Sequence, residues 1–251
     1  LWLAGHGFDN LLLAYPTTDR AALRELGELT AENPDGAPIV MIDSIEHLDL
    51  IERATDNPVR LCLDLDAGYW RAGGRVKIGP KRSPLHTPEQ ARALAVEIGR
   101  RPALKLVALM CYEGHIAGVG DKVAGKFAQN LIVARMQRMS FQELRQRRAR
   151  AVELVREVAD LEIVNAGGTG ELQLVAQEPS ITEATAGSGF YAPTQFDTYS
   201  TFTLQPAAMF ALPVSRRPDA KTATALGGGY LASGVGAKDR MPTPYLPAGL
   251  R

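Results

Sequence analysis

The chain has 251 residues, and its 28 basic and 28 acidic side chains give a formal net charge of zero. A hydrophobic content of 45% supplies a buried core, which excludes a disordered chain. The balanced charge does not indicate binding to nucleic acid or to an anionic membrane, so neither is expected as a partner. No apolar run is long enough to span a bilayer. Cys62 and Cys111 lie in apolar runs, which indicates buried thiols in a reducing compartment, the cytoplasm.

Apolar runs alternate with segments of helical periodicity along the first 185 residues. The apolar runs predict strands over residues 10–15, 38–42, 59–65, 104–111, 161–164 and 181–184. Helix caps are expected at Thr18 or Asp19, at Ser44 and at Thr87. Residues 66–86 are predicted to form a long loop. A long helical region is expected to reach Asp160, with a break or kink at the capping-box pattern of residues 140–143.

This repeat of strands and helices predicts an α/β fold with buried parallel strands. Residues 1–7 read as the last turn of a helix with a glycine cap, so we expect sequence before Leu1. We assign residues 1–200 to an incomplete TIM (β/α)8 barrel, truncated at its N-terminus, whose visible strands are the third to the eighth. Residues 201–251 are expected to begin a β-rich C-terminal domain. An open doubly wound sheet is the alternative.

Two glycine-rich turns follow the last two predicted strands. The first covers residues 165–170 (Asn-Ala-Gly-Gly-Thr-Gly), and the second covers residues 186–191 (Ala-Gly-Ser-Gly-Phe-Tyr). Glycine lets the backbone come close to an anion, and free N–H groups then bind it. Phosphate sites after the seventh and eighth strands recur in barrels of this kind. The two turns therefore predict a phosphate-bearing cofactor or substrate.

Four segments of the chain together resemble a known enzyme family. They are residues 64–66 followed by 75–79, residues 110–115, residues 165–170 and residues 186–191. Over nearly its whole length the chain resembles the pyridoxal-phosphate enzymes with an alanine-racemase-type N-terminal barrel. Within them it is similar to the D-threonine aldolase and D-serine dehydratase branch, in particular to bacterial proteins called amino acid deaminase/aldolase.

The resemblance implies roles for particular residues. It places Tyr112, His115 and Arg75 beside the cofactor or substrate, with Asp64 and Asp66 orienting the arginine. It assigns the binding of pyridoxal 5'-phosphate to Asn165, Gly167, Gly168, Thr169, Gly170, Ser188, Gly189, Phe190 and Tyr191. The family's imine-forming lysine is expected before Leu1. The ligands of a divalent metal, Zn or Mn, are expected after Arg251, so no metal ligand is assigned within the chain.

The implied activity is that of a pyridoxal-phosphate lyase acting on a D-3-hydroxy amino acid, with a homodimer as the whole protein. Cleavage of the bond to the β-carbon gives an aldolase, and loss of the β-hydroxyl gives a dehydratase. Three other functions stay open: an amino acid racemase on the same scaffold, a non-catalytic cofactor-binding protein, and a phosphate-sugar barrel enzyme without this cofactor. The sequence does not distinguish between the aldolase, dehydratase and racemase outcomes.

Overall fold

The structure is a computed structural model that describes residues 1–229 and 241–250. It divides into two compact units, each described here by itself. The first unit contains Leu1–Gly118 and Gln137–Thr185, and the second contains Val119–Met136 and Ala186–Arg251. Among the described residues, no helix combines the length and apolar character needed to cross a membrane.

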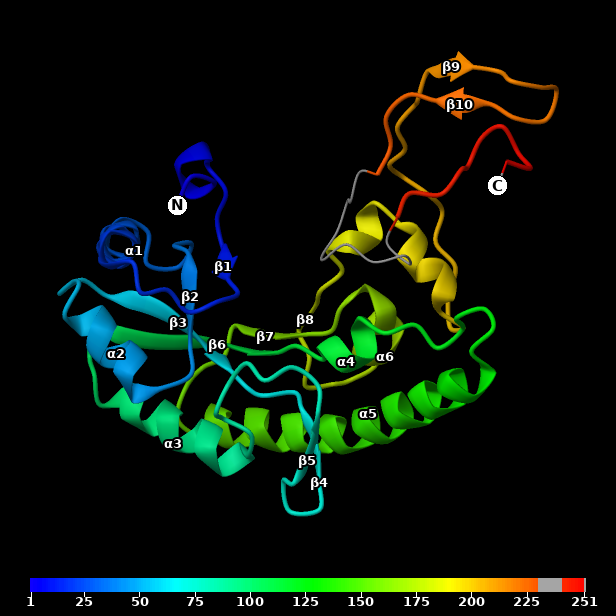
Figure 1. Cartoon of the computed structure of the whole chain (residues 1–251). Coiled ribbons are helices and arrows are strands. Elements are labelled where there is room, and N and C mark those ends of the chain that lie inside the picture. Colours follow the sequence, from blue (N-terminus) through cyan, green and yellow to red (C-terminus); the bar gives the residue numbers. More distant parts are fainter. Residues whose placement is uncertain (230–240, 251) are drawn as a thin grey trace. The chain divides into compact units, whose positions relative to one another are not determined.

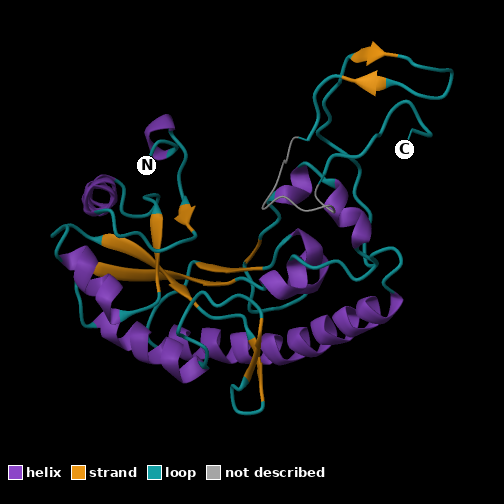
Figure 2. Ribbon diagram, in the orientation of Figure 1, coloured by secondary structure: helices purple, strands orange, loops and turns teal. Residues whose placement is uncertain are grey.

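The first unit is built on a sheet of six parallel strands in the order β1-β2-β3-β6-β7-β8. The strands are β1 (Leu12–Leu13), β2 (Ile39–Ile42), β3 (Val59–Asp64), β6 (Leu104–Cys111), β7 (Ile163–Ala166) and β8 (Glu183–Ala184). Figure 2 shows that the sheet is curled rather than flat. The predicted α/β fold with buried parallel strands is thereby confirmed.

The helices are α1 (Arg20–Glu32), α2 (Ile45–Glu52), α3 (Pro88–Gly99), α4 (Gly114–Ala117), α5 (Phe127–Arg156) and α6 (Leu172–Val175). Of these, α1, α2, α3 and α5 pack on one face of the sheet (Figure 1). The predicted caps are confirmed. Asp19 accepts the amides of the first turn of α1, Ser44 caps α2, and Thr87 forms a complete capping box with Gln90.

Two buried clusters lie on the two faces of the sheet. The larger one packs α1, α2, α3 and α5 against the strands, as Leu26, Leu48 and Val152 illustrate. The smaller one includes Met41, Cys62 and Met110 from the alternate positions of the same strands, with Tyr112 packed against it. Strand residues alternate between the two faces, so the helix-covered core and the inner face of the curl come from the same segments.

Two predictions about the connections were wrong. The expected loop over residues 66–86 contains an antiparallel hairpin of β4 (Tyr69–Arg71) and β5 (Val76–Ile78). At residues 140–143, where a break or kink was expected, α5 has no break and runs without interruption through Ser140. The Ser140 hydroxyl hydrogen-bonds the ring of His115 and therefore does not act as a helix cap. β7 also begins two residues later than predicted, so Asn165 lies within the strand.

The second unit has little regular structure. It contains two 3-10 turns, η3 (Ser188–Phe190) and η4 (Thr194–Thr198), and an antiparallel pair of β9 (Val214–Arg216) and β10 (Thr224–Ala225). The Asp121 carboxylate accepts hydrogen bonds from the amide and hydroxyl of Ser200, at 2.8 and 2.5 Å. Phe196, Tyr199 and Phe202 form an aromatic cluster with ring centres 5.3–5.9 Å apart. The division into a barrel of residues 1–200 and a β-rich domain of residues 201–251 stays a prediction.

Candidate functional site

Ionisable side chains gather at the carboxyl ends of the central strands of the first unit. Asp43 follows β2, Asp64 ends β3, and Tyr112 follows β6. Asp64 is only 4% exposed, and its burial raises the pKa of its carboxyl to about 7, against the opposing charge of Arg82. Asp43 and Asp66 raise this pKa further. A carboxyl group that titrates near neutral pH at this end of the sheet marks a candidate site.

Arg82 brings a positive charge to this edge. Its guanidinium lies 4.7 Å from the ring centre of Tyr15 and 5.4 Å from that of Tyr112, and its Nη2 donates to the Ala14 carbonyl at 2.9 Å. Burial raises the pKa of the Tyr112 phenol. The charge of Glu171 adds to this upward shift, and the charge of Arg82 opposes it. Tyr112 therefore stays protonated at neutral pH beside a cation.

The arginine that sequence reasoning selected lies elsewhere. Arg75 is exposed at the tip of the β4–β5 hairpin, where its amide donates to the Ala72 carbonyl at 3.4 Å. The geometry therefore gives no support to Arg75 as the cofactor-side arginine, and its role stays a prediction. Arg82 was missed because the hairpin, which the sequence did not predict, changes which arginine returns to the strand ends. The only sequence signal for Arg82 is its position shortly before the Thr87 helix cap.

His115 is buried in α4, at 7% exposure, and its Nε2 hydrogen-bonds Ser140 Oγ of α5. Its Nδ1 is buried without a hydrogen-bond partner among the described residues. Burial lowers the pKa of the imidazole to about 4; the charge of Asp66 opposes this shift and that of Arg147 adds to it. The ring is therefore neutral at physiological pH. A Cβ added at Gly79 would lie 2.7 Å from His115 Nδ1, so the end of the hairpin packs closely on this ring.

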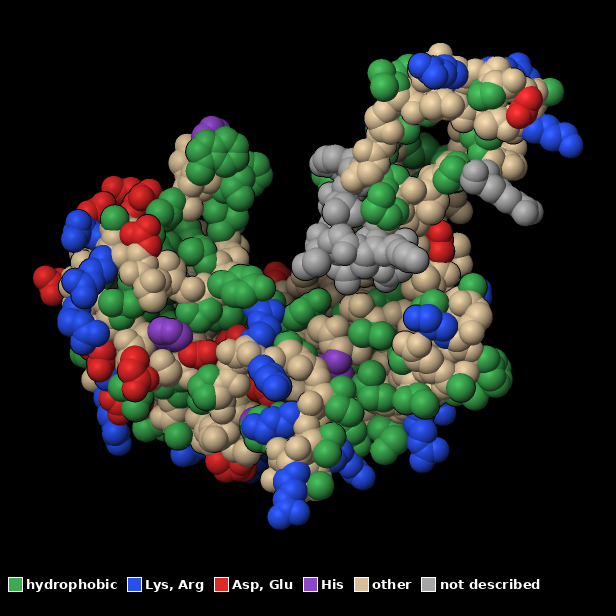
Figure 3. All heavy atoms as spheres, in the orientation of Figure 1, with side chains coloured by type: hydrophobic (Ala, Val, Ile, Leu, Met, Phe, Trp, Pro, Cys, Tyr) green, Lys and Arg blue, Asp and Glu red, His purple; other side chains and the backbone are tan. Residues whose placement is uncertain are grey.

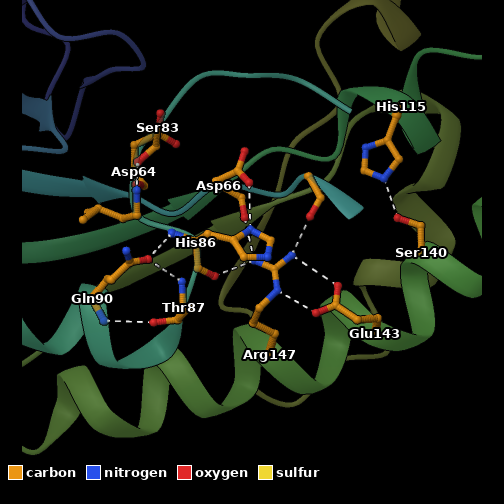
Figure 4. A network of polar contacts seen from close by, with 12 residues as sticks. Asp64, Asp66, Ser83, His86, Thr87, Gln90, His115, Ser140, Glu143 and Arg147 are labelled. Atoms are coloured by element: carbon orange, nitrogen blue, oxygen red, sulfur yellow. Dashed lines mark hydrogen bonds and ion pairs between the residues drawn. The ribbon is translucent and has the colours of Figure 1, made fainter. Parts of the chain in front are cut away.

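A polar network shapes the loop that follows β3 (Figure 4). Arg147 donates to the carbonyls of Asp66, His86 and Gly68 at 2.7–2.9 Å and pairs with Glu143. The Asp66 carboxylate contacts His86 Nδ1 at 2.9 Å. Asp66 is thus engaged with His86 rather than with an arginine side chain. The network holds the loop in one conformation and so fixes the segment that leads to Arg82.

An open cavity of about 560 Å³ lies beside this loop. It is lined by Asp66, Gly68, Trp70 and residues 77–84. Figure 3 shows basic side chains gathered over this part of the molecule, which contributes Arg71, Arg75, Lys77, Lys81 and Arg82. Lys77 Nζ lies 3.6 Å from the centre of the Trp70 ring, which in turn stacks on His86. Of the residues given a role from the sequence, Asp66 lines the cavity, and so does Arg82, whereas Arg75, Tyr112 and His115 do not.

The first glycine turn packs directly against Tyr112. Gly167 has φ +84°, which favours glycine, and its amide donates to Glu113 Oε2 at 2.8 Å. A Cβ added at Gly168 would lie 2.8 Å from Ala117 Cβ and 3.2 Å from Tyr112 Cε2. The structure therefore brings the turn and Tyr112 together, as predicted for neighbouring parts of one site. Thr169 and Gly170 follow in the 3-10 turn η2 (Thr169–Glu171).

Asn165 ties β7 to β8 rather than facing solvent. Its Nδ2 donates to Glu183 Oε1 at 2.5 Å and to Thr185 Oγ1 at 2.7 Å. Its Oδ1 is buried without a hydrogen-bond partner among the described residues. This side chain accordingly holds the two strand ends together beside the glycine turn, and a direct contact with the cofactor stays a prediction.

Glu171, at the end of η2, is a feature that sequence reasoning missed. Its side chain is fully buried, and neither carboxyl oxygen has a hydrogen-bond partner among the described residues. Burial raises the pKa of this carboxyl to about 8; Arg148 opposes the shift and Glu178 adds to it. Glu171 is therefore protonated at neutral pH, directly behind the glycine turn.

The second glycine turn lies in the other unit. Ser188, Gly189 and Phe190 form η3, in which the Phe190 amide donates to Gly187 and the Tyr191 amide donates to Ser188, at 3.3 and 3.1 Å. The side chains of Phe190 and Tyr191 are 78% and 67% exposed. These two amides are already engaged within the turn. The convergence of the two glycine turns on one phosphate stays a prediction.

Comparisons with known proteins bear on the fold. No protein-family model and no curated protein matches the chain. Among solved structures it is similar to D-threonine aldolase from Filomicrobium marinum, with a TM-score of 0.68 and 15% identity over 90% of this chain and 57% of that chain. It is also similar to alanine racemases from E. faecalis and Corynebacterium glutamicum. Their TM-scores are 0.51 and 0.50, each at 14% identity, over 82% and 87% of this chain and 47% and 53% of those chains.

These comparisons concern a part of each neighbour, because the chain spans about half the length of the structures that it matches. Identities of 14–15% show a shared fold and leave the specific activity open. The resemblance stated from the sequence is confirmed at that level. The chain has the curled α/β sheet of the alanine-racemase-type barrel, the fold of D-threonine aldolase, alanine racemase and other pyridoxal-phosphate enzymes of fold type III.

Proposed function

We propose that this chain is the cofactor-binding barrel of a pyridoxal-phosphate lyase acting on D-3-hydroxy amino acids. The observation that carries the proposal is the contact between Gly168 and Tyr112 at the carboxyl ends of β6 and β7, with Arg82 over the same tyrosine ring. Barrel enzymes place their chemistry at this end of the strands. The lyase activity is proposed from the sequence resemblance, and the similarity of the fold to that of D-threonine aldolase is consistent with it.

The first glycine turn fits a phosphate group. A side chain at Gly168 would overlap Ala117 and crowd Tyr112, so the turn keeps its backbone bare at this point. The Gly167 amide is used by Glu113, so the donors for an anion would come from Gly168 and Gly170. Several converging donors are needed to offset the desolvation of a phosphate dianion.

When bound, pyridoxal phosphate supplies an electron-withdrawing ring that weakens the bonds to the substrate's α-carbon. The chain's own residues would hold it in place. Tyr112 keeps its phenolic proton, because its pKa is raised, and can donate a hydrogen bond. Arg82 offers a cation beside that phenol, and the nearby Asp64 carboxyl interacts with it electrostatically. In this role Arg82 replaces Arg75. The neutral ring of His115 packs against Gly79 at the end of the hairpin and hydrogen-bonds Ser140 of α5.

Within this proposal, cleavage of the α–β carbon bond releases an aldehyde, whereas loss of the β-hydroxyl yields a keto acid and ammonia. A racemase is the alternative, since two of the similar structures are alanine racemases. A divalent metal remains part of the proposal for the whole protein. Among the described residues, no group of three or more His, Cys, Asp or Glu side chains has a geometry that could hold a metal ion.

The proposal is tested on the gene product in its full genomic length, purified with added pyridoxal phosphate. An absorption band at roughly 410–430 nm is expected for the lysine-bound cofactor. Incubation with D-threonine or D-serine should then give aldehyde or ammonia, while the L-enantiomers should not react. Absence of the band would contradict the cofactor assignment. A band together with interconversion of D- and L-alanine, without aldehyde or ammonia, would favour the racemase.

A further inference from the structure

A buried ionic network lies directly behind the first glycine turn. Arg148 of α5 and Glu113, which follows Tyr112, are both fully buried, and Arg148 Nη1 pairs with Glu113 Oε1. On its other side Arg148 contacts Glu178 through Nη2 at 2.5 Å and through Nε at 3.2 Å. One guanidinium thus joins α5, the turn after β6 and the segment after α6. A buried arginine needs such counter-charges. Replacing either carboxylate by a neutral side chain would leave buried positive charge uncompensated and so destabilise the fold.

Glu113 also reaches the glycine turn itself. While Oε1 faces Arg148, Oε2 accepts the Gly167 amide at 2.8 Å. The carboxylate therefore uses one oxygen for the ionic network and the other for the backbone of the turn. Gly167 directly follows β7 and is in the left-handed region at φ +84°. The Glu113 bond is a charge-assisted one and sets the direction of the chain entering Gly168.

We propose that Glu113 is a positioning residue for anion binding at this turn. It does not contact the ligand. It fixes Gly167, with Arg148 holding its carboxylate in place, so that the amides of Gly168 and Gly170 face the position of the phosphate. The inference rests on the proposed function, because it assumes that the anion is the phosphate of pyridoxal phosphate. In this role Glu113 affects the affinity for phosphate through the backbone of the turn, without contacting the ligand.

Glu113→Gln is the variant that tests this role. The amide side chain has only one oxygen, so its NH2 group must face either Arg148 or the Gly167 amide, and one donor meets another donor. The matched control is Glu162→Gln. Glu162 pairs with the buried Arg60 in a similar way, but it precedes β7, whereas the glycine turn follows the end of that strand. Both variants remove one carboxylate from a buried arginine.

The readout is the ratio of the affinities for pyridoxal phosphate and pyridoxal, measured by titration calorimetry on the chain. Loss of stability alone lowers both affinities, whereas misplacement of the phosphate donors lowers the ratio. Glu113→Gln is expected to lower the ratio by about tenfold, and Glu162→Gln to leave it within about twofold of the wild-type value. An unchanged ratio in Glu113→Gln would overturn the inference. A wild-type protein that binds both compounds equally would instead overturn the proposed function.

A second measurement covers the case in which Glu113→Gln does not fold. Amide hydrogen exchange of the wild-type chain, resolved by NMR, reports on the Gly167 N–H directly. Its bond to a buried carboxylate predicts exchange as slow as that of the neighbouring strand amides. Exchange as fast as that of exposed loop amides would contradict the positioning role, whatever the ligand of the turn.

Discussion

The guanidinium of Arg82 lies 5.4 Å from the centre of the Tyr112 ring, so a cation and a protonated phenol meet at the carboxyl end of β6. They come from segments about thirty residues apart that α3 and β6 separate. Arg82 also lies over the Tyr15 ring and donates a hydrogen bond to the Ala14 carbonyl, so it links the end of β1 to the end of β6. This arrangement leads to the first prediction.

Arg82→Ala should weaken the binding of pyridoxal phosphate by about tenfold, because a cation beside the ligand and an aromatic contact are both lost. Arg75→Ala is the matched control, since Arg75 is exposed at the hairpin tip. It should change the affinity by less than about twofold. Titration calorimetry of both variants distinguishes the two arginines. A larger loss for Arg75→Ala would restore the assignment made from the sequence.

Glu171→Gln should change how stability depends on pH. The folded-state pKa of Glu171 is raised from 4.5 to about 8, so the folded state holds a proton that the unfolded state releases. The stabilisation is complete below pH 4.5 and is lost as pH rises through about 8, by at most about 5 kcal/mol. Urea unfolding between pH 5 and 9 should show a steeper loss for the wild type than for Glu171→Gln. Parallel curves would show that Glu171 is ionised in the folded protein.

Gly79→Ala should destabilise the first unit by roughly 2 kcal/mol. Gly79 has φ +117°, and the added Cβ would lie 2.7 Å from His115 Nδ1. Gly99, the last residue of α3, has open space around it and no positive φ, so Gly99→Ala serves as the control. It should be neutral or stabilising by about 0.5 kcal/mol. Chemical denaturation of the two variants gives the comparison, and equal effects would mean that the hairpin end does not pack on His115.

His115→Gln should make the protein less sensitive to acid. Burial lowers the pKa of His115 to about 4, so the folded state resists a proton that the unfolded state accepts near pH 6.5. The stability that neutral His115 contributes is present above pH 6.5 and is lost as pH falls toward 4. Thermal unfolding at pH 7.5 and 5 should show a smaller decrease for His115→Gln than for the wild type. The exposed His6, changed to Gln, is the control and should behave as the wild type does.

The backbone of the first unit was largely predictable because its signals are local. β6 is a continuous apolar run, and Thr87 and Gln90 form the expected capping box. The order of six parallel strands followed from the alternation of strands and helices. The two errors have physical causes. The hairpin strands have only three residues each, too few for a clear strand signal, and Ser140 bonds a side chain from a distant segment instead of capping a helix.

The side-chain arrangement at the strand ends was only partly predictable. Tyr112 and the first glycine turn were identified from their positions after strands, and the structure places them in contact. Arg148 and Glu171 carry no local signal, because a charged residue in a helical segment is expected on the surface. Only the folded chain shows that Arg148 is fully buried between two carboxylates.

The central claim is that the turn beginning at Gly167 binds the phosphate of pyridoxal phosphate. Titration calorimetry of the chain with pyridoxal phosphate and with pyridoxal tests it most directly. The account predicts that the phosphate improves affinity by about a hundredfold or more, and that Gly168→Val, whose side chain would overlap Ala117, abolishes this preference. Equal affinity for the two compounds, or a preference that survives in Gly168→Val, would contradict it.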